Sequence, residues 1–346
     1  MTPKKLILLA LIATFAAASC SKKSTPSPTT KAPVVYVTGV CQSAANGLAL
    51  AVYWKDGVKK VLADSTGSNQ SVATGIAVMD TDVYISGAVN VVASYWKNGK
   101  AVQVSGARSY ANAIAISGND VYLAGFSTYN GNIEPTYWKN GNAVILDDGG
   151  GRTIADGIAV SGSDVYVAGH SQTASGSSII VYWKNGIFTN CANSQSGSAT
   201  YYSTTYYQGW VNIAISGSYA DVTGATMGFN VATYWKDGVS VPILINPTEP
   251  SVATNINING NDVYVTGSYY FNATYWKNGI MTTLPSGALP YSMAAAIAIN
   301  GSDVYVAGFG GANTTTSTTA LYWKNGVLTT LPGNVSATTG IALVQY

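Results

Sequence analysis

The amino-acid sequence predicts an all-β protein, a seven-bladed β-propeller of four-stranded antiparallel blades. The string Tyr-Trp-Lys-(Asn/Asp)-Gly occurs seven times, 41 to 52 residues apart, which is the length of one propeller blade. Two further strings, close to Ile-Ala-Ile and Val-Tyr-Val-Ala-Gly, recur between its copies. The repeated tryptophans, which we expect to be structural, are Trp54, Trp96, Trp138, Trp183, Trp235, Trp276 and Trp323.

Each string has the pattern of a strand or a tight turn. Residues 114–125 place Ser-Gly-Asn-Asp between the apolar strings Ile-Ala-Ile and Val-Tyr-Leu-Ala-Gly, which predicts two strands joined by a tight turn. Tyr-Trp ends a third strand, and the Asn-Gly or Asp-Gly behind it suits a two-residue hairpin before a weaker fourth strand. Adjacent Tyr and Trp side chains point to opposite faces of a strand. We therefore expect neighbouring blades to cover both faces.

The order of the strings at the two ends predicts how the ring closes. The repeat region begins with a second-strand string, Val34 to Gly39, and ends with a first-strand string, Ile341 to Tyr346. Pairing of the C-terminal strand in the first blade would complete that blade. It would also remove the open edges that an incomplete array presents.

Composition limits the functions open to the chain. Only 9% of its residues are charged, against about 25% in an average globular protein. Five of the 17 basic residues precede residue 34, whereas all 15 acidic residues follow it. The repeat region is therefore not basic, and we expect no nucleic-acid partner.

Residues 1–19 are predicted to be a signal peptide. Lys4 and Lys5 precede the apolar residues 6–19, a run shorter than the roughly 20 residues that span a bilayer. Ala17-Ala18-Ser19-Cys20 resembles a bacterial lipoprotein cleavage site. That resemblance implies a lipid-anchored protein of the cell outer membrane, acylated at Cys20. An ordinary signal peptide with an incidental cysteine is the alternative.

Residues 20–33 are predicted to be a tether, because they hold three prolines and no large apolar side chain. Residues 34–346 then form the propeller. Cys41 and Cys191 lie in different repeats, so we expect two buried or free thiols and no disulfide.

The repeats resemble bacterial extracellular HAF-type repeats, which similarly alternate an Ile-Asn-Gly-like hairpin, a Gly-ended strand and a Trp-x-x-Gly hairpin. Kelch blades are more distantly similar, because their double glycine is missing here. The resemblance covers residues 34–346 and implies the fold. It brings no catalytic residue, because such repeats define none.

The two faces of the predicted propeller differ. One face carries the short Ser-Gly-x-Asp and Lys-Asn-Gly turns, which is typical of a solvated rim of opposite charges or of a charged docking ring. The other carries the connections of variable length, including residues 40–50, 126–135, 170–180, 190–211, 284–294 and 309–319. Variable loops on a rigid frame usually carry recognition.

Tyrosines are concentrated in these variable connections. The candidate ligand-binding residues are Tyr129, Tyr201, Tyr202, Tyr206, Tyr207, Trp210, Tyr269, Tyr270 and Tyr291, with Phe271 beside them. Aromatic rings among Ser, Asn and Thr suit a sugar or a peptide. The alternative is that they only cover the ends of the blades.

The sequence predicts a monomeric, non-catalytic binding or interaction module for a glycan or protein, with no metal or cofactor. A scaffold that docks a membrane partner is the alternative, and a polysaccharide-acting enzyme is a third reading. His170, the one histidine, is expected at the surface without an oriented partner. For the enzyme alternative, the two glutamates, Glu134 and Glu249, are the candidates for a glycosidase-type pair of carboxyl groups. Asp221 stands where the other second strands have Tyr.

Overall fold

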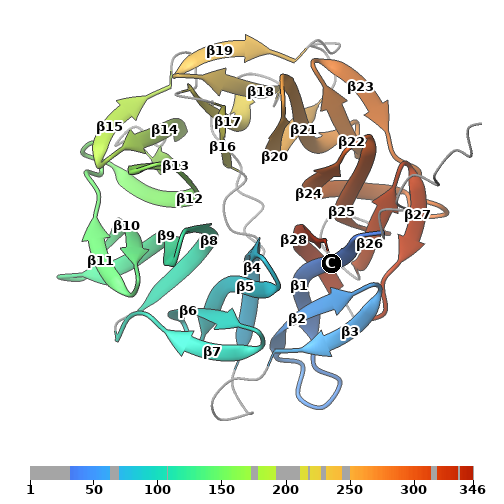
Figure 1. The fold of residues 1–346 in the computed structure, drawn as a ribbon, viewed down its shortest axis with the longest axis horizontal. Coiled ribbons are helices and arrows are strands. Elements are labelled where there is room, and N and C mark those ends of the chain that lie inside the picture. The colour runs from blue at the N-terminus through green and yellow to red at the C-terminus, as the bar shows by residue number, and fades with distance from the viewer. Residues whose placement is uncertain are drawn as a thin grey trace, which may run out of the picture. The chain divides into compact units, whose positions relative to one another are not determined.

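The computed structural model describes residues 32–62, 70–106, 108–172, 178–191, 211–216, 219–226, 231–243, 250–312, 318–333 and 336–345. Within these ranges the regular structure is β-strand, arranged as seven four-stranded antiparallel sheets. In Figure 1 the sheets of the Pro33–Tyr346 unit surround a common centre. The predicted class, a propeller of four-stranded antiparallel blades, is confirmed. The described residues include no helix able to span a membrane.

Six sheets run in chain order from the centre to the rim, and in the seventh the C-terminal strand β28 is innermost, before β1, β2 and β3. The first strands are β4 (Ser71–Met79), β8 (Ser109–Ser117), β12 (Arg152–Ser161), β16 (Ile213–Ser216), β20 (Ser251–Asn259), β24 (Tyr291–Asn300) and β28 (Ser336–Val344). The second are β1 (Val34–Gln42), β5 (Asp82–Val89), β9 (Asp120–Tyr129), β13 (Asp164–Gln172), β17 (Tyr219–Thr226), β21 (Asp262–Tyr269) and β25 (Asp303–Gly311).

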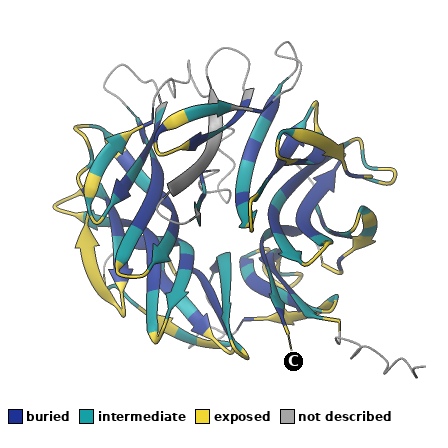
Figure 2. Ribbon diagram, turned by 45° about the horizontal axis from the view of Figure 1, so that its top comes forward, coloured by how far each residue is buried: buried dark blue, intermediate teal, exposed yellow. Residues whose placement is uncertain are grey.

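The outer half of each sheet is a second hairpin. The third strands are β2 (Ala49–Lys55), β6 (Val92–Lys97), β10 (Asn132–Lys139), β14 (Ser178–Lys184), β18 (Val231–Lys236), β22 (Asn272–Lys277) and β26 (Thr319–Lys324). The fourth are β3 (Val58–Val61), β7 (Lys100–Gln103), β11 (Asn142–Ile145), β15 (Ile187–Asn190), β19 (Val239–Pro242), β23 (Ile280–Thr283) and β27 (Val327–Thr330). Figure 2 shows exposed residues along this outer edge and buried ones inside.

The first and last described strands belong to one sheet. β28 pairs antiparallel with β1, from Val34 opposite Val344 to Cys41 opposite Ser336. β1 continues the sheet to β2 and β3. The pairing strand begins at Ser336, earlier than the six C-terminal residues that the sequence indicated. Like β4, β8 and β20 it is nine residues long and contains a bulge.

A bulge explains the glycine that ends the second-strand string. In the sheet of β4 to β7, the register shifts between Ala73 and Gly75, so β4 bends toward β5. A Cβ at Gly87 would collide with the Val72 carbonyl oxygen. Only glycine admits this approach. The same collision recurs at Gly39, Gly125, Gly169, Gly267 and Gly308.

The repeated tryptophans fill the interfaces between sheets. All seven are at most 1% exposed. Trp96 packs against Tyr36 and Ala51 of the preceding sheet, and Trp54 packs against Tyr305 and Ala307 of the sheet that ends the repeat series. The indole Nε1 of Trp54 donates to the Pro332 carbonyl at 2.9 Å. Burial of an aromatic side chain of this size removes about 150–250 Å² from water.

Tyrosines that precede the tryptophans are only half-buried. The expectation that both faces are covered therefore holds for Trp and only in part for Tyr. A second interface contact comes from serines at the start of inner strands, whose Oγ accepts the N–H of an alanine in the preceding third strand. The N–H-to-Oγ distances are 2.9–3.1 Å in the donor–acceptor pairs Ala51–Ser71, Ala93–Ser109, Ala232–Ser251, Ala273–Ser292 and Ala320–Ser336.

Candidate functional site

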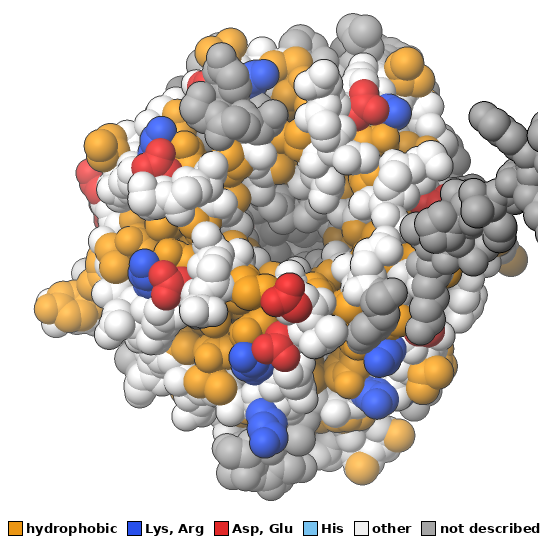
Figure 3. Space-filling model, viewed as in Figure 1, with side chains coloured by type: hydrophobic (Ala, Val, Ile, Leu, Met, Phe, Trp, Pro, Cys, Tyr) orange, Lys and Arg blue, Asp and Glu red, His pale blue; other side chains and the backbone are white. Residues whose placement is uncertain are grey.

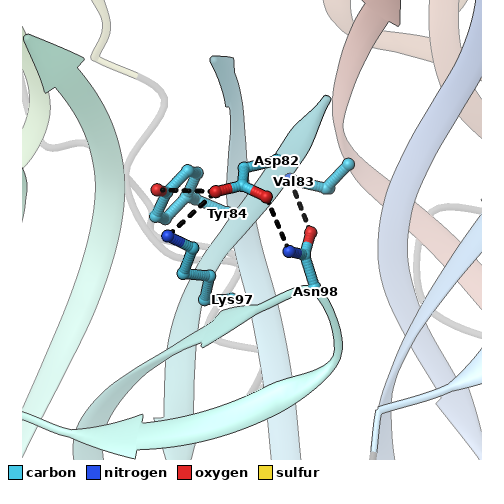
Figure 4. A network of polar contacts seen from close by, with 5 residues as sticks. All are labelled: Asp82, Val83, Tyr84, Lys97 and Asn98. Carbon is cyan, nitrogen blue, oxygen red and sulfur yellow. Dashed lines mark hydrogen bonds and ion pairs between the residues drawn. The ribbon is translucent and has the colours of Figure 1, made fainter. Parts of the chain in front are cut away.

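The first surface with a defined arrangement is the face of short turns. At the start of β5, the Asp82 carboxylate lies 2.9 Å from Lys97 Nζ and accepts a 2.8 Å hydrogen bond from Asn98 Nδ2 (Figure 4). Asn98 Oδ1 accepts the Val83 N–H at 3.0 Å. The Lys97 ammonium also lies 5.0 Å from the centre of the Tyr84 ring. Each charged group therefore has its partners within one sheet.

This network occurs five times in the described residues. Figure 3 shows Lys side chains beside Asp side chains around this face. The Asp–Lys pairs are Asp82–Lys97, Asp120–Lys139, Asp164–Lys184, Asp262–Lys277 and Asp303–Lys324, at 2.7–3.3 Å. The lysine side chains are 43–48% exposed. The geometry is that of a solvated rim, because each cation is already paired.

Two turns carry Asp where the others carry Asn. They are Asp56 and Asp237, and in their sheets the position of the strand aspartate holds Val34 or Tyr219. Asp56 Oδ1 accepts the Val35 N–H at 2.9 Å, as Asn98 Oδ1 does from Val83. An amide is required only where it must also donate to a strand carboxylate. Sequence comparison of the repeats alone could have shown this exchange.

A groove between β4–β7 and β8–β11 opens on the same face. It has a volume of about 340 Å³, and its lining includes Tyr84, Tyr95, Lys97, Asn119 and Asn140. Lys97 and Asn140 already belong to the Asp–Lys–Asn networks. The groove is therefore a product of the repeat and has no chemistry of its own.

The opposite face carries the connections between second and third strands. Three of these are two-residue turns: Asn90-Val91, Asn130-Gly131 and Tyr270-Phe271. At the last two the sequence had indicated variable loops. Residues 126–135 in particular are mostly strand, in β9 and β10. The error arose because composition shows polar residues but not that strand pairing continues through them.

The turn Tyr270-Phe271 is conformationally strained. Both residues have positive φ, 46° and 65°, which is unusual for bulky side chains and costs about 1–3 kcal/mol per residue. The equivalent turn of β9 and β10 uses Asn130 and Gly131, which adopt this shape readily. Tyr270 is 56% exposed and Phe271 51% exposed. Burial therefore gives little in return for the strain.

These two rings begin an aromatic row across two sheets. Ring centres are 5.8 Å apart for Tyr270–Phe271, 6.3 Å for Phe271–Tyr291 and 6.4 Å for Tyr291–Phe309, with planes tilted by 48–53°. Backbone bonds fix the turn: the Ser292 N–H donates to the Phe271 carbonyl at 2.9 Å. Phe309 is 7% exposed and forms the buried end. We call Tyr270, Phe271, Tyr291 and Phe309 the aromatic row.

The structure unites some of the predicted ligand residues and separates others. Tyr270 and Tyr291 belong to the aromatic row, and Tyr269 packs beside it against the core of its sheet. Tyr129 is 57% exposed but lies in the sheet of β8 to β11. Sequence reasoning did not select Phe309, because inter-sheet contacts decide its place. Tyr201, Tyr202, Tyr206, Tyr207 and Trp210 lie outside the described residues, as does residue Cys20.

His170 corrects a prediction. It was expected at the surface without a partner, but its side chain is 14% exposed and its Nδ1 lies 2.6 Å from Asp156 Oδ2. Asp156 occupies the bulge of β12, one strand away, so sequence distance hid the pair. Burial acts to lower the pKa of His170, but the Asp156 carboxylate outweighs it and the pKa is raised.

Two adjacent aspartates and the two described cysteines have local roles. Asp147 and Asp148 accept the N–H groups of Gly149 and Gly150 at 2.9 and 2.8 Å, which makes a polar turn. Cys41 and Cys191 are buried free thiols, as predicted. Burial raises the pKa of Cys191 to about 12.

The remaining candidates are placed as follows. Asp221 faces Lys236 in the register of β17 and β18. Glu134 lies in β10, and Glu249 is outside the described residues.

No protein-family model matches the chain, and no curated protein matches it. Solved structures show the propeller fold. A puromycin-hydrolyzing peptidase of Mycobacterium tuberculosis aligns with a TM-score of 0.52 at 9% identity, over 86% of this chain and 53% of the peptidase. The designed Ika8 protein aligns with a TM-score of 0.47 at 17% identity, over 88% and 90%. Identities this low indicate fold alone.

The Asp–Lys–Asn networks should make the stability of the fold depend on pH. Hydrogen bonds from Lys97 and Asn98 hold the pKa of Asp82 below its ordinary value. This stabilisation is therefore complete above about pH 4 and is lost as pH falls through the lower folded-state pKa. We expect Asp82→Asn to lower the Tm at pH 5 and to match the wild type near pH 2. Thermal melts across this range test it, with exposed Asp80→Asn as the control that leaves the Tm unchanged; a constant Tm difference between D82N and the wild type would contradict it.

Relief of turn strain should stabilise the fold. We expect the double variant Tyr270→Asn/Phe271→Gly to raise the free energy of unfolding by about 1–2 kcal/mol. The reason is that relief of the backbone strain stabilises the fold by more than the loss of the ring contacts destabilises it. Val91→Gly in the equivalent turn should add about 1 kcal/mol. Urea denaturation measures both. A less stable double variant would show that the rings stabilise the fold themselves.

The single histidine permits a direct titration. We expect the NMR pKa of His170 above about 6.5, and below it in Asp156→Asn, because burial then acts unopposed. The stabilisation that His170 gains from Asp156 is present below about pH 6.5 and is lost as the pH rises through the raised pKa of His170. Asp148→Asn should leave the titration unchanged. An equal pKa in D156N and wild type would remove the assigned role of Asp156.

Proposed function

We propose that the protein is a non-catalytic binding or interaction module of the cell envelope, built on a seven-bladed ring closed by its C-terminal strand. Contacts that join neighbouring sheets elsewhere recur where the chain's ends meet. Trp54 reaches Pro332 just as Trp323 reaches Pro285. Thr339 Oγ1 donates to the Ala73 carbonyl at 3.0 Å, as Thr74 does to Ala111. These matching junctions support a continuous ring.

The observation that carries the binding role is the strained, exposed turn Tyr270-Phe271. Strain that packing does not require is typical of functional sites. The turn sits at the face where recognition loops gather on a rigid frame. Asn-Gly, used elsewhere in this chain at the same place, would serve the fold better. The proposal explains why this turn has Tyr-Phe in place of Asn-Gly: the two rings are needed to bind a ligand.

Two other functions are less well supported. A scaffold that docks a membrane partner through the Asp–Lys face would need charges that are not already paired in their own sheets. An enzyme has the peptidases as propeller neighbours, but the chain spans only about half of their length at 9% and 14% identity. That likeness extends to the fold alone.

Retention on the cell envelope tests the proposed binding role. The full chain with Cys20→Ser, which lacks the proposed anchor, should co-sediment with the washed, detergent-extracted envelope fraction of the producing cells. Tyr270→Asn/Phe271→Gly should reduce the bound fraction at least tenfold, although the variant is more stable. Val91→Gly relaxes a matched turn outside the row and should bind like the parent. The proposal would be overturned if the Cys20→Ser chain were not retained on the envelope, or if the Tyr270→Asn/Phe271→Gly and Val91→Gly variants were retained equally.

A further inference from the structure

We propose that the aromatic row binds a neutral carbohydrate, with Tyr270, Phe271 and Tyr291 stacking on sugar rings. This inference rests on the proposed binding role and names its ligand class. Tyr and Phe rings have large apolar faces, and the ring hydrogens of a pyranose form a flat apolar patch of comparable size. Such stacking gives contact area at low ordering cost because each aromatic side chain has only two rotatable bonds.

The absence of charged residues along the described strands that carry the row favours a neutral ligand. No Asp, Glu, Lys or Arg occurs between Asp262 and Lys277, between Lys277 and Asp303, or between Asp303 and Lys324. The charged residues at these boundaries lie at the opposite ends of their strands. Charged partners are normally met by complementary potential. The described strands that carry the row offer no such potential to a nucleic acid, an acidic polysaccharide or a charged peptide; Glu249, which precedes Pro250, lies outside the described residues.

The shape of the row favours sugars over a neutral peptide. Tyr270 and Phe271 occupy the tip of a hairpin, which projects, and both rings are half exposed. Extended peptides are bound in aromatic grooves or along sheet edges, whereas Tyr270 and Phe271 form a turn between β21 and β22, the two middle strands of their sheet. Tilts of 52–53° between successive rings present separate faces to successive sugar units.

Polar groups beside the rings suit hydroxyl recognition. Asn272 Nδ2 donates to the Tyr270 carbonyl at 3.0 Å, which leaves its amide oxygen at the tip of the turn. The Tyr291 hydroxyl lies 4.0 Å from the Met293 sulfur, a weak acceptor. A hydroxyl-rich ligand can form hydrogen bonds with such groups in addition to the contacts that they make within the protein.

Chemical treatment of the envelope distinguishes the ligand classes. The Cys20→Ser chain is mixed with envelope that has been oxidised with periodate and reduced with borohydride, digested with proteinase K, or left untreated. Periodate cleaves vicinal diols and so destroys sugar rings. We expect retention to fall at least tenfold after periodate and to be unchanged by the protease. Retention should also persist at about 1 M NaCl, which screens ionic contacts beyond roughly 3 Å.

Each outcome has a separate meaning. Retention that survives periodate but not protease would identify a protein partner, which overturns this inference and leaves the binding role in place. Retention lost at high salt would exclude a neutral ligand. No retention on untreated envelope would instead remove the proposed function itself. Asn272→Ala should weaken retention several-fold without the gain in stability that the double turn variant shows.

Discussion

Packing of one indole into each interface between sheets is the interaction on which the rest of the structure depends. Each tryptophan is essentially inaccessible and packs in a buried cluster with side chains of a neighbouring sheet, as Trp54 does with the sheet of β24 to β27. A single four-stranded sheet cannot bury such a side chain alone. Neighbouring sheets therefore stabilise one another through the same kind of contact.

A frame built from repeated contacts leaves its two faces free to differ. On one face, five Asp–Lys–Asn networks in the described residues pair their charges within single sheets. Asp56 accepts the strand N–H that an Asn accepts in those networks. On the other face, the turn Tyr270-Phe271 departs from what its backbone prefers. The contrast between a satisfied face and a strained one underlies the assignment of recognition to the aromatic row.

The Asp156–His170 pair shows a second departure from the repeat. Equivalent bulge positions hold Thr74, Thr254 and Thr339, each of which donates a hydrogen bond to a carbonyl of the next sheet. A carboxylate cannot make that bond, and Asp156 instead pairs with the histidine of its own sheet. This repeat thus differs from the others at two positions, those of Asp156 and His170, as expected for one buried pair and not for two independent surface residues.

The sequence by itself determined the fold class, the strand order and the burial of the tryptophans, because a periodic pattern of turns, glycines and aromatics is written locally in each repeat. It also indicated Tyr270 and Tyr291 through their aromatic character. Only the tertiary structure joined these two rings to Phe271 and Phe309, revealed the positive φ of the turn and paired His170 with Asp156. Those features depend on contacts between strands and sheets that are distant in sequence, and no local pattern encodes such contacts.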